Sequence, residues 1–479
     1  MSQSFRDVFY SFMPNQPTKD QIDLVERMER FLFQPIERAG FIIRGYAGTG
    51  KTTSIAALVK TLPKFNYKSV LLAPTGRAAK VMATFSNKPA FTIHKKIYQV
   101  KRSGDGQMKF ALAANLHNNT VFMVDEASMI SDRGGVRNSG FQQRSLLEDL
   151  ITYVYSGKNC RLVFIGDIAQ LPPVGSDLSP ALDPNHLKRN FFLNLKGVEL
   201  KQVMRQADGS GILYNATNLR EELNAEVPLI QFKVDGFDDV QPITGVELED
   251  ELHAAYSKYE ESDVMVITRS NKRANEFNQQ IRIRIKGQED AISTGDYLMV
   301  VKNNYFWLDE ESPIGFIANG DIAEVMRLGN TEELYGFKFV DATLRLIDYP
   351  KHPAVEVKLL LDTINSDSPA LTREENQSFY EKVMEDYLEV SSQRKRLELL
   401  KKNPHFNALQ VKFANAVTCH KSQGGQWKVV FVDQGYLTEE MVNQEYIRWL
   451  YTAISRATEK LYLVNFHPRF YENYNSSAF

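Results

Sequence analysis

The sequence predicts an α/β protein built from two tandem domains of the nucleotide-binding type. Short apolar, β-branched segments alternate with helical stretches in two separate blocks of the chain. A glycine-rich loop at residues 45–52 joins the first strand and helix of the first block. A β-rich segment without a long helix interrupts the second block. At 479 residues the chain also exceeds the size that one hydrophobic core usually supports, so several domains are expected.

The strands of the two blocks are short, apolar and rich in Val, Ile and Leu, which is typical of parallel strands covered on both faces. In the first block they are residues 41–45 (FIIRG), 69–73 (SVLLA), 121–125 (VFMVD) and 162–167 (LVFIGD). In the second block they are residues 264–268 (VMVIT), 429–433 (VVFVD) and 461–466 (LYLVNF). Helices are expected from residue 51, near residues 76–85, after residue 271 and over residues 445–455.

Segments of a different character interrupt both blocks. Residues 95–112 read as two strands around the turn signal SGDG, which predicts a hairpin. Several β-type runs between residues 296 and 362 predict a small antiparallel barrel, and residues 373–403 are helical in pattern. The expected division is a first domain of residues 1–94 and 113–198, a hairpin at 95–112, a second domain of residues 199–294 and 412–479, and an insertion at 295–411.

The bulk composition excludes some classes of protein. Lys and Arg number 57 against 59 Asp and Glu, so the chain is not uniformly basic, although a local basic channel remains compatible with this balance. The only cysteines, Cys160 and Cys419, lie in apolar runs and are expected to be reduced. We find no signal-peptide pattern and no apolar run of the roughly 18 residues that span a membrane. These features predict a cytoplasmic protein without membrane association.

The loop at residues 45–52, GYAGTGKT, matches the phosphate-loop pattern in full. It follows a strand and opens a helix, so its backbone N–H groups can surround phosphate oxygens at a helix N-terminus. Lys51 is expected to reach the β- and γ-phosphates, and the Thr52 hydroxyl to ligate Mg²⁺. The nucleotide-binding residues expected in this loop are Gly48, Thr49, Gly50, Lys51, Thr52 and Thr53.

Two carboxylates, Asp125 and Glu126, follow the strand VFMV. Alone they would indicate only a solvated strand end, but downstream of a phosphate loop they predict phosphoryl-transfer chemistry. Asp125 is expected to bind Mg²⁺ through water, and Glu126 to activate the attacking water. The two motifs together predict a nucleoside triphosphatase.

Six further motifs resemble those of superfamily 1B DNA helicases, in the order of that family and over nearly the whole chain. The phage Dda type looks most similar, with the RecD type as the nearest cellular branch. The motifs are TKDQ at 18–21, APTGRAAK at 73–80, GDIAQLPPV at 166–174, LKQVMRQ at 200–206, VTCHKSQG at 417–424 and YTAISRA at 451–457.

The resemblance implies two RecA-like motor domains, an SH3-like barrel with helices inserted in the second, and ATP with Mg²⁺ as cofactors. Gln21 would read the adenine edge, although a surface Gln on a helix would look the same in sequence. Gln170 would sense the γ-phosphate, and Arg205 and Arg456 would act as arginine fingers. Backbone phosphates of single-stranded DNA would contact Thr75, His94, His420 and Ser422.

The resemblance also implies a 5′-to-3′ DNA helicase that works as a monomer on single-stranded and fork DNA. Its expected setting is phage DNA replication or recombination in the host cytoplasm, beside partners such as a single-strand-binding protein. An ATP-switched module that displaces proteins or remodels nucleic acid, and an RNA helicase, are the alternatives.

The hairpin at 95–112 corresponds to a strand-separating pin in relatives, and IANGD at 317–321 to a turn of their barrel. Two points stay open from the sequence. Residues 131–140 form either a surface loop or a DNA contact, and each aromatic ring that could stack on bases could equally belong to a core. Those rings are Tyr98, Phe110, Tyr305, Phe306 and Trp307.

Overall fold

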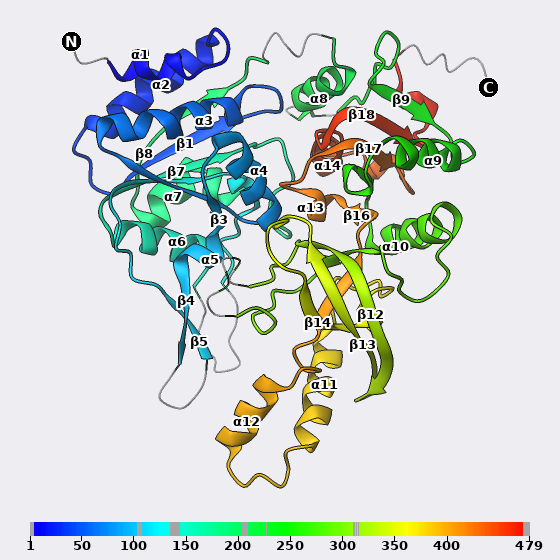
Figure 1. Ribbon diagram of the computed structural model, residues 1–479. Helices are drawn as coiled ribbons and strands as arrows, with labels where there is room; N and C mark the ends of the chain where they lie inside the picture. The colour runs from blue at the N-terminus through cyan, green and yellow to red at the C-terminus, as the bar shows by residue number, and fades with distance from the viewer. Residues whose placement is uncertain are drawn as a thin grey trace.

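The computed structural model consists of two α/β domains, a hairpin that projects from the first and a barrel with two helices that projects from the second. The hairpin and the barrel lie on the same side of the molecule (Figure 1). Among the residues that the structure describes, no helix combines the length and apolar character needed to cross a membrane. Described are residues 4–102, 108–134, 144–203, 209–223, 225–226, 228–309, 312, 314 and 316–472.

The first domain is a six-stranded parallel sheet in the order β3-β2-β6-β7-β1-β8. Its central strands are buried because helices cover both faces of a parallel sheet. The strands are β1 (Ala39–Gly45), β2 (Lys68–Ala73), β3 (Ala90–Thr92), β6 (Asn118–Val124), β7 (Lys158–Gly166) and β8 (Asn194–Leu200). The helices are α1 (Phe5–Ser11), α2 (Lys19–Phe33), α3 (Lys51–Thr61), α4 (Gly76–Ser86), α5 (Ile93–Ile97), α6 (Leu146–Tyr155) and α7 (Pro184–Phe191).

The second domain is a five-stranded parallel sheet in the order β16-β10-β17-β18-β9, with an apolar core on each face. Its strands are β9 (Val240–Ile243), β10 (Val264–Thr268), β16 (Ala416–Thr418), β17 (Trp427–Asp433) and β18 (Ala457–Val464). Its helices are α8 (Gly211–Glu222), α9 (Leu248–Lys258), α10 (Asn271–Gln280), α13 (Cys419–Ser422) and α14 (Gln444–Ile454). The predicted fold class of two tandem α/β domains is confirmed.

A closed five-stranded barrel interrupts the second domain. Its strands are β11 (Tyr297–Val300), β12 (Ile322–Leu334), β13 (Phe337–Leu346), β14 (Val355–Leu360) and β15 (Leu409–Phe413). The helices α11 (Arg373–Glu385) and α12 (Gln393–Lys402) lie between β14 and β15. The last strand, β15, runs two residues past the boundary expected at residue 411, and the chain enters β16 directly afterwards.

The hairpin consists of β4 (Tyr98–Arg102) and β5 (Met108–Leu112), paired antiparallel from Tyr98 opposite Leu112. The predicted first strand began at Lys95, but α5 occupies residues 93–97. The Thr92 side chain caps this short helix by accepting the Lys95 N–H, so the chain turns helical before the hairpin starts.

The remaining helical elements are short connections between these layers. They are the 3₁₀ segments η1 (Leu62–Phe65), η2 (Ala127–Met129), η3 (Pro180–Leu182), η5 (Glu261–Asp263), η7 (Leu361–Thr363), η8 (Glu439–Met441) and η9 (Pro468–Phe470), and the π-helical turn η6 (Ile281–Ile285).

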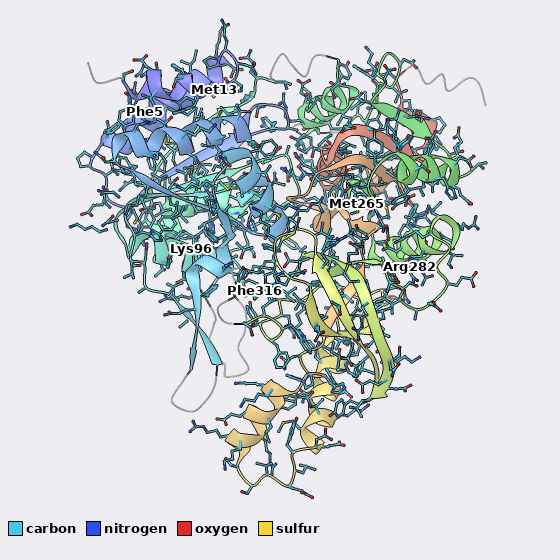
Figure 2. The ribbon with its side chains drawn as sticks, viewed as in Figure 1. Phe5, Met13, Lys96, Met265, Arg282 and Phe316 are labelled. Carbon is cyan, nitrogen blue, oxygen red and sulfur yellow. The ribbon has the colours of Figure 1, made fainter. Side chains whose placement is uncertain are left out.

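A buried ion pair joins the second domain to the barrel. Arg282, in the turn η6, donates from Nε and Nη2 to the Asp296 carboxylate at 2.9 and 3.0 Å, just before β11 begins. The two side chains are 5% and 0% exposed, and the guanidinium lies 4.3 Å from the centre of the Phe413 ring of β15. Figure 2 labels Arg282 on the second domain. The pair therefore fixes the end of α10 against both barrel strands that lead in and out of the domain.

We expect Arg282→Ala to destabilise the protein by about 3–5 kcal/mol, because Asp296 would stay buried without its partner. The matched control is Arg284→Ala, two residues along, whose ion pair with Glu249 is exposed and contributes about 1 kcal/mol or less. Urea unfolding followed by circular dichroism compares the two variants. Equal midpoints for both variants would contradict the role of the buried pair.

Candidate nucleotide and nucleic-acid site

The glycine-rich loop joins β1 to α3 and takes a conformation that needs glycine. Gly48 and Gly50 have φ angles of 73° and 78°, in the left-handed region that L side chains rarely adopt. A Cβ on Gly48 would also lie 3.1 Å from Leu213 of α8, which belongs to the second domain. The loop thus presents its backbone at the N-terminus of α3, where unpaired N–H groups and the helix dipole favour phosphate.

The polar side chains of the loop are held close to it. Lys51 Nζ donates to the carbonyls of Gly45 and Tyr46 at 2.6 and 2.8 Å, and lies 3.9 Å from Asp167 Oδ2. The Thr49 hydroxyl is buried and donates to Tyr46, so only its backbone is available to a ligand. Thr52 and Thr53 are partly buried in the first turn of α3.

The two predicted catalytic carboxylates lie where β6 ends. Asp125 Oδ1 accepts the backbone N–H of Glu126 at 2.9 Å. Burial, and next the negative charge of Glu126, raise the pKa of Asp125 to about 7. A divalent cation beside these groups would offset both effects, as Mg²⁺ sites built on carboxylates do.

Three of the predicted contact residues carry buried polar atoms that have no hydrogen-bond partner within the described part of the chain. These atoms are Glu126 Oε2, Gln170 Oε1 and Gln21 Nε2. Leaving such an atom unpaired costs about 1–3 kcal/mol, so natural proteins rarely do so without a ligand or water to satisfy it. The donor and acceptor set therefore fits a bound nucleoside triphosphate.

The two amide atoms of Gln21 have different surroundings. Its Oε1 accepts the Thr18 N–H at 2.9 Å, and the Thr18 hydroxyl accepts the Gln21 N–H at 3.3 Å, which is a capping box at the start of α2. The side chain is completely buried, so the alternative of an exposed surface Gln does not apply. Its amide nitrogen remains available as a donor.

Arg456 reaches the first domain from the second. It is 4% exposed, and its guanidinium donates to the Thr452 and Gly425 carbonyls. Its Nη1 also lies 4.0 Å from Glu126 Oε1. The structure thus places a fixed positive charge from one domain beside the carboxylate of the other. The second predicted finger, Arg205, lies outside the described residues.

Further hydrogen bonds join the same two domains around the loop at residues 166–174. The Tyr451 hydroxyl donates to Asp167 Oδ2 at 2.5 Å and accepts the Ala47 N–H at 2.8 Å. Leu171 donates its N–H to the Thr452 hydroxyl at 2.9 Å and accepts from Gln423 Nε2 at 2.7 Å. Sequence reasoning missed Tyr451, whose only signal was its place at the start of the YTAISRA motif.

The predicted DNA-contact residues do not share one environment. The Thr75 hydroxyl caps α4 by accepting the Ala78 N–H at 3.2 Å. His94 and His420 are partly exposed, and burial lowers the pKa of each, so both imidazoles are neutral at pH 7. They can therefore offer a phosphate an N–H donor but no charge.

Ser422 lies deeper than the other predicted DNA contacts. Its side chain is completely buried, and its hydroxyl donates to the Cys419 carbonyl at 2.8 Å. A hydroxyl in this position presents no donor to a phosphate, because α13 turns Ser422 inward and leaves His420 nearer the surface. Ser422 stabilises the motif rather than contacting DNA in this conformation.

Helix α4, which begins after Thr75, is held by both the barrel and the second domain. A Cβ on Gly76 would collide with the Asp321 carboxylate of the barrel turn at 317–321. Arg77 lies over the Trp427 ring at 4.2 Å and donates to the Gln426 carbonyl. Burial raises the pKa of Asp321 to about 7. Sequence patterns did not indicate this three-way contact.

The predicted stacking aromatics have other roles where they are described. Tyr98 donates its hydroxyl to Asp149 of α6 at 2.7 Å, which anchors the hairpin at its base. Trp307 donates from Nε1 to the Asn407 carbonyl and stands edge-on to Phe306. Tyr305 packs against Phe316 at a ring separation of 4.7 Å. The side chain of Phe110, the hairpin tip and residues 135–143 lie outside the described residues.

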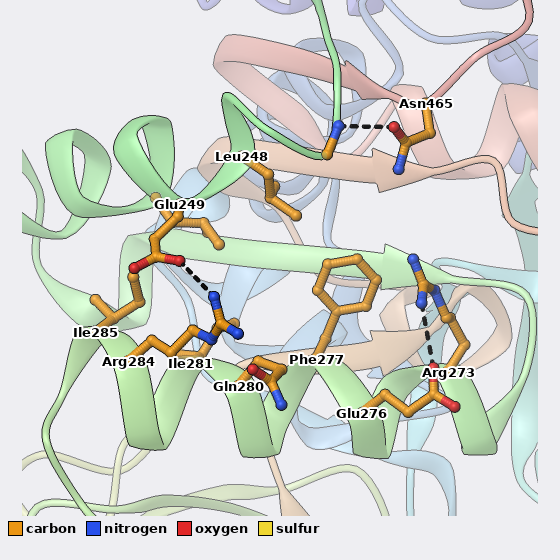
Figure 3. Close-up of a pocket in the computed structure, with 12 residues that line it drawn as sticks. Leu248, Glu249, Arg273, Glu276, Phe277, Gln280, Ile281, Arg284, Ile285 and Asn465 are labelled. Carbon is orange, nitrogen blue, oxygen red and sulfur yellow. Dashed lines mark hydrogen bonds and ion pairs between the residues drawn. The ribbon is translucent and has the colours of Figure 1, made fainter.

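A pocket of about 240 Å³ lies between α9 and α10 on the second domain (Figure 3). Leu248, Phe277 and Ile281 contribute apolar surface to it, and Glu249 pairs with Arg284 at 2.9 Å. None of the predicted nucleotide or DNA residues lines it. The candidate site is therefore formed by the junction of the two domains and not by this pocket.

The phosphate loop and the arginine that faces its glutamate come from different domains, so fold and site together define a two-domain P-loop NTPase. The family model described as "AAA domain" matches residues 36–231, and that described as "UvrD-like helicase C-terminal domain" matches residues 413–464. Together with the relatives described next, these two matches support a superfamily 1B helicase.

Similar proteins agree with this assignment. The chain is 27% identical over 235 residues to the ATP-dependent RecD2 DNA helicase of Deinococcus radiodurans, covering 48% of this chain and 28% of that protein. It is 29% identical over 182 residues to the ATP-dependent DNA helicase dda of Enterobacteria phage T4, covering 37% of each. These matches span about a third of the relatives' own lengths.

The fold as a whole is shared with a solved structure. The Pif1 helicase from Bacteroides, in complex with ADP-AlF3 and ssDNA, matches with a TM-score of 0.50 at 14% identity, over 95% of this chain and 94% of that one. At this identity the likeness concerns the fold alone.

We expect Gln21→Glu to raise the KM for ATP about tenfold, because the carboxylate keeps the capping acceptor but removes the amide donor. Gln21→Ala, which loses both functions, is the comparison, and it should lower the melting temperature as well. Steady-state ATP hydrolysis and thermal unfolding separate the two effects. An unchanged KM in Gln21→Glu would show that the free amide does not contact the nucleotide.

Proposed function

We propose that this protein is an ATP-driven DNA helicase that translocates 5′ to 3′ on single-stranded DNA. The observation that carries the proposal is the approach of Arg456 to Glu126 across the two domains at 4.0 Å. A catalytic glutamate that meets its arginine only when two domains close makes hydrolysis depend on their relative position. Such dependence is what a translocating motor requires.

The roles of the residues follow from where their side chains lie. Lys51 exchanges its two backbone carbonyl acceptors for phosphate oxygens, and Thr52 and Asp125 would hold Mg²⁺. Mg²⁺ bound there would neutralise charge on the phosphate oxygens. Glu126 orients the attacking water through its free carboxylate oxygen. Arg456 stabilises the charge that develops on the transferred phosphoryl group, with Arg205 as the second finger.

The DNA track of the proposal uses both domains. Thr75 and His94 lie on the first domain and His420 on the second, so one strand can be held alternately by each. Contacts to backbone phosphates fix position without reading sequence, which suits a motor that must move along any strand. DNA as the substrate is supported by the similarity to RecD2 and dda, whose names describe DNA helicases. The 5′-to-3′ direction is proposed from the resemblance of the sequence motifs alone.

The hairpin β4–β5 is proposed as the strand-separating pin, on the same side of the molecule as the barrel (Figure 1). An apolar or aromatic side chain there would wedge against the terminal base pair of a fork. We further propose that the protein acts in phage DNA replication or recombination in the host cytoplasm, as the resemblance to the phage type of helicase suggested. We propose that it works as a monomer beside a single-strand-binding protein.

We expect Glu126→Gln to lower kcat by at least about a hundredfold while ATP and DNA still bind, because the amide cannot accept the water proton. Rapid-quench hydrolysis and fluorescence anisotropy with labelled single-stranded DNA measure the two properties on the same preparation. Turnover at the parent rate would remove Glu126 from the catalytic role.

The proposed function is tested by ATP hydrolysis with and without single-stranded DNA, for the parent and Lys51→Ala. We expect a DNA stimulation of about tenfold or more that the variant lacks, since Lys51 loses its phosphate contact. Unwinding of matched DNA and RNA duplexes with 5′ or 3′ tails then decides the track and direction. Hydrolysis indifferent to DNA, or unwinding only of RNA, would overturn the proposal. Stimulation without unwinding of either duplex would leave a remodelling module.

A further inference from the structure

The Tyr451 hydroxyl stands between the two domains at the phosphate loop. It is carried by α14 of the second domain, and the side chain is 1% exposed. Both its hydrogen bonds cross to the first domain, one to the Asp167 carboxylate at 2.5 Å and one from the Ala47 N–H at 2.8 Å. A single hydroxyl therefore connects the phosphate loop, the loop at residues 166–174 and the YTAISRA motif.

The direction of these hydrogen bonds is fixed by chemistry. Burial and the neighbouring Asp167 raise the pKa of Tyr451 well above its ordinary value, so the phenol keeps its proton and donates it to Asp167. A hydrogen bond from a neutral donor to a buried carboxylate is stronger than one between neutral groups. The lone pairs of the phenol oxygen then accept the Ala47 N–H, which belongs to the phosphate loop.

Asp167 connects Tyr451 with Lys51, the residue expected to contact the phosphates. Its Oδ1 accepts the Ala169 N–H at 2.9 Å, and its Oδ2 is shared between Tyr451 and the approach of Lys51 at 3.9 Å. Asp167 is therefore held so that its negative charge faces the lysine. Removal of the Tyr451 hydroxyl would release one side of this carboxylate without changing the apolar packing of the ring.

The same helix end supplies the arginine. Tyr451 precedes Arg456 by five residues, and Arg456 is braced on the Thr452 carbonyl of that helix at 3.0 Å. When Tyr451 locates α14 against the phosphate loop, it also sets where the guanidinium meets Glu126. Thr452, the residue after Tyr451, accepts the Leu171 N–H and so helps to hold α14 in the same position against the first domain.

We propose that Tyr451 is a positioning residue for ATP hydrolysis, whose hydroxyl sets the closed register of the two domains through Asp167 and Ala47. This inference rests on the proposed function, because it assumes that hydrolysis needs the closed arrangement. Tyr451 acts through other residues and does not contact the phosphates itself. The Tyr46 ring of the loop, whose hydroxyl donates to Glu199, belongs to a separate contact.

The test is Tyr451→Phe in the full chain, with Tyr462→Phe as the matched control. Tyr462 lies in the same domain, and its hydroxyl also donates to a carboxylate, that of Glu251 at 2.9 Å, away from the junction. With saturating single-stranded DNA we expect kcat to fall about tenfold in Tyr451→Phe, with KM for ATP within about twofold of the parent. Tyr462→Phe should keep the parent kcat. Both variants should lose thermal stability to a similar, small extent.

Asp167→Asn and the double variant with Tyr451→Phe measure whether the two groups act as one unit. We expect the double variant to be little slower than the slower single variant, since the residues would share one effect. Fully multiplicative losses, or a parent kcat in Tyr451→Phe, would overturn the positioning role. A loss of stability in Tyr451→Phe without a fall in kcat would also overturn it, because a purely structural hydroxyl gives that result.

The outcomes also separate this inference from the proposed function. A parent enzyme that hydrolyses ATP without stimulation by DNA would overturn the helicase proposal alone. In that case kcat of Tyr451→Phe and of the parent is compared without DNA. Equal values would overturn the positioning role. A parent without any hydrolysis would overturn both.

Discussion

The arrangement of the two domains depends on the approach of a positively charged side chain of one to a carboxylate of the other. Glu126 is partly buried just after the end of β6, and the guanidinium of Arg456, just after α14, approaches it across the junction. Burying part of a carboxylate is costly without a nearby cation or donor, so the approach of Arg456 favours the closed arrangement of the two domains. The hydrogen bonds of Tyr451, Thr452 and Gln423 then determine the angle at which they close.

The site also leaves polar atoms unsatisfied where ligands are expected. Gln21, Glu126 and Gln170 each bury one atom that lacks a partner in the described ranges, while most other polar atoms of the same motifs are paired. Lys51 donates hydrogen bonds to carbonyls of its own loop in this structure. The energetic cost of these open positions favours nucleotide binding, because the ligand would satisfy several of them together.

The sequence indicated the central strands and the nucleotide motifs well, since buried parallel strands and a phosphate loop have strong local patterns. The strands β3, β8, β9 and β16 were not predicted, because they lie at sheet edges and are short or carry polar residues. Spacing alone does not decide which side of a short helix faces inward, so the burial of Ser422 could not be predicted from the sequence. The contacts of Tyr451, and that of Asp321 with α4, join segments far apart in the sequence, so no local sequence pattern predicts them.

The join between the barrel and the second domain has a mechanical consequence. Only Ala414 and Asn415 separate β15 from β16, and the Arg282–Asp296 pair clamps the other end of the connection. The barrel with α11 and α12 is therefore rigidly attached to the edge of the second sheet, so any rotation of the second domain carries the barrel with it. A small rotation near the nucleotide would become a larger displacement at α11 and α12, which project on the same side of the molecule as the hairpin (Figure 1). Amplification of this kind needs no flexible hinge within the barrel itself.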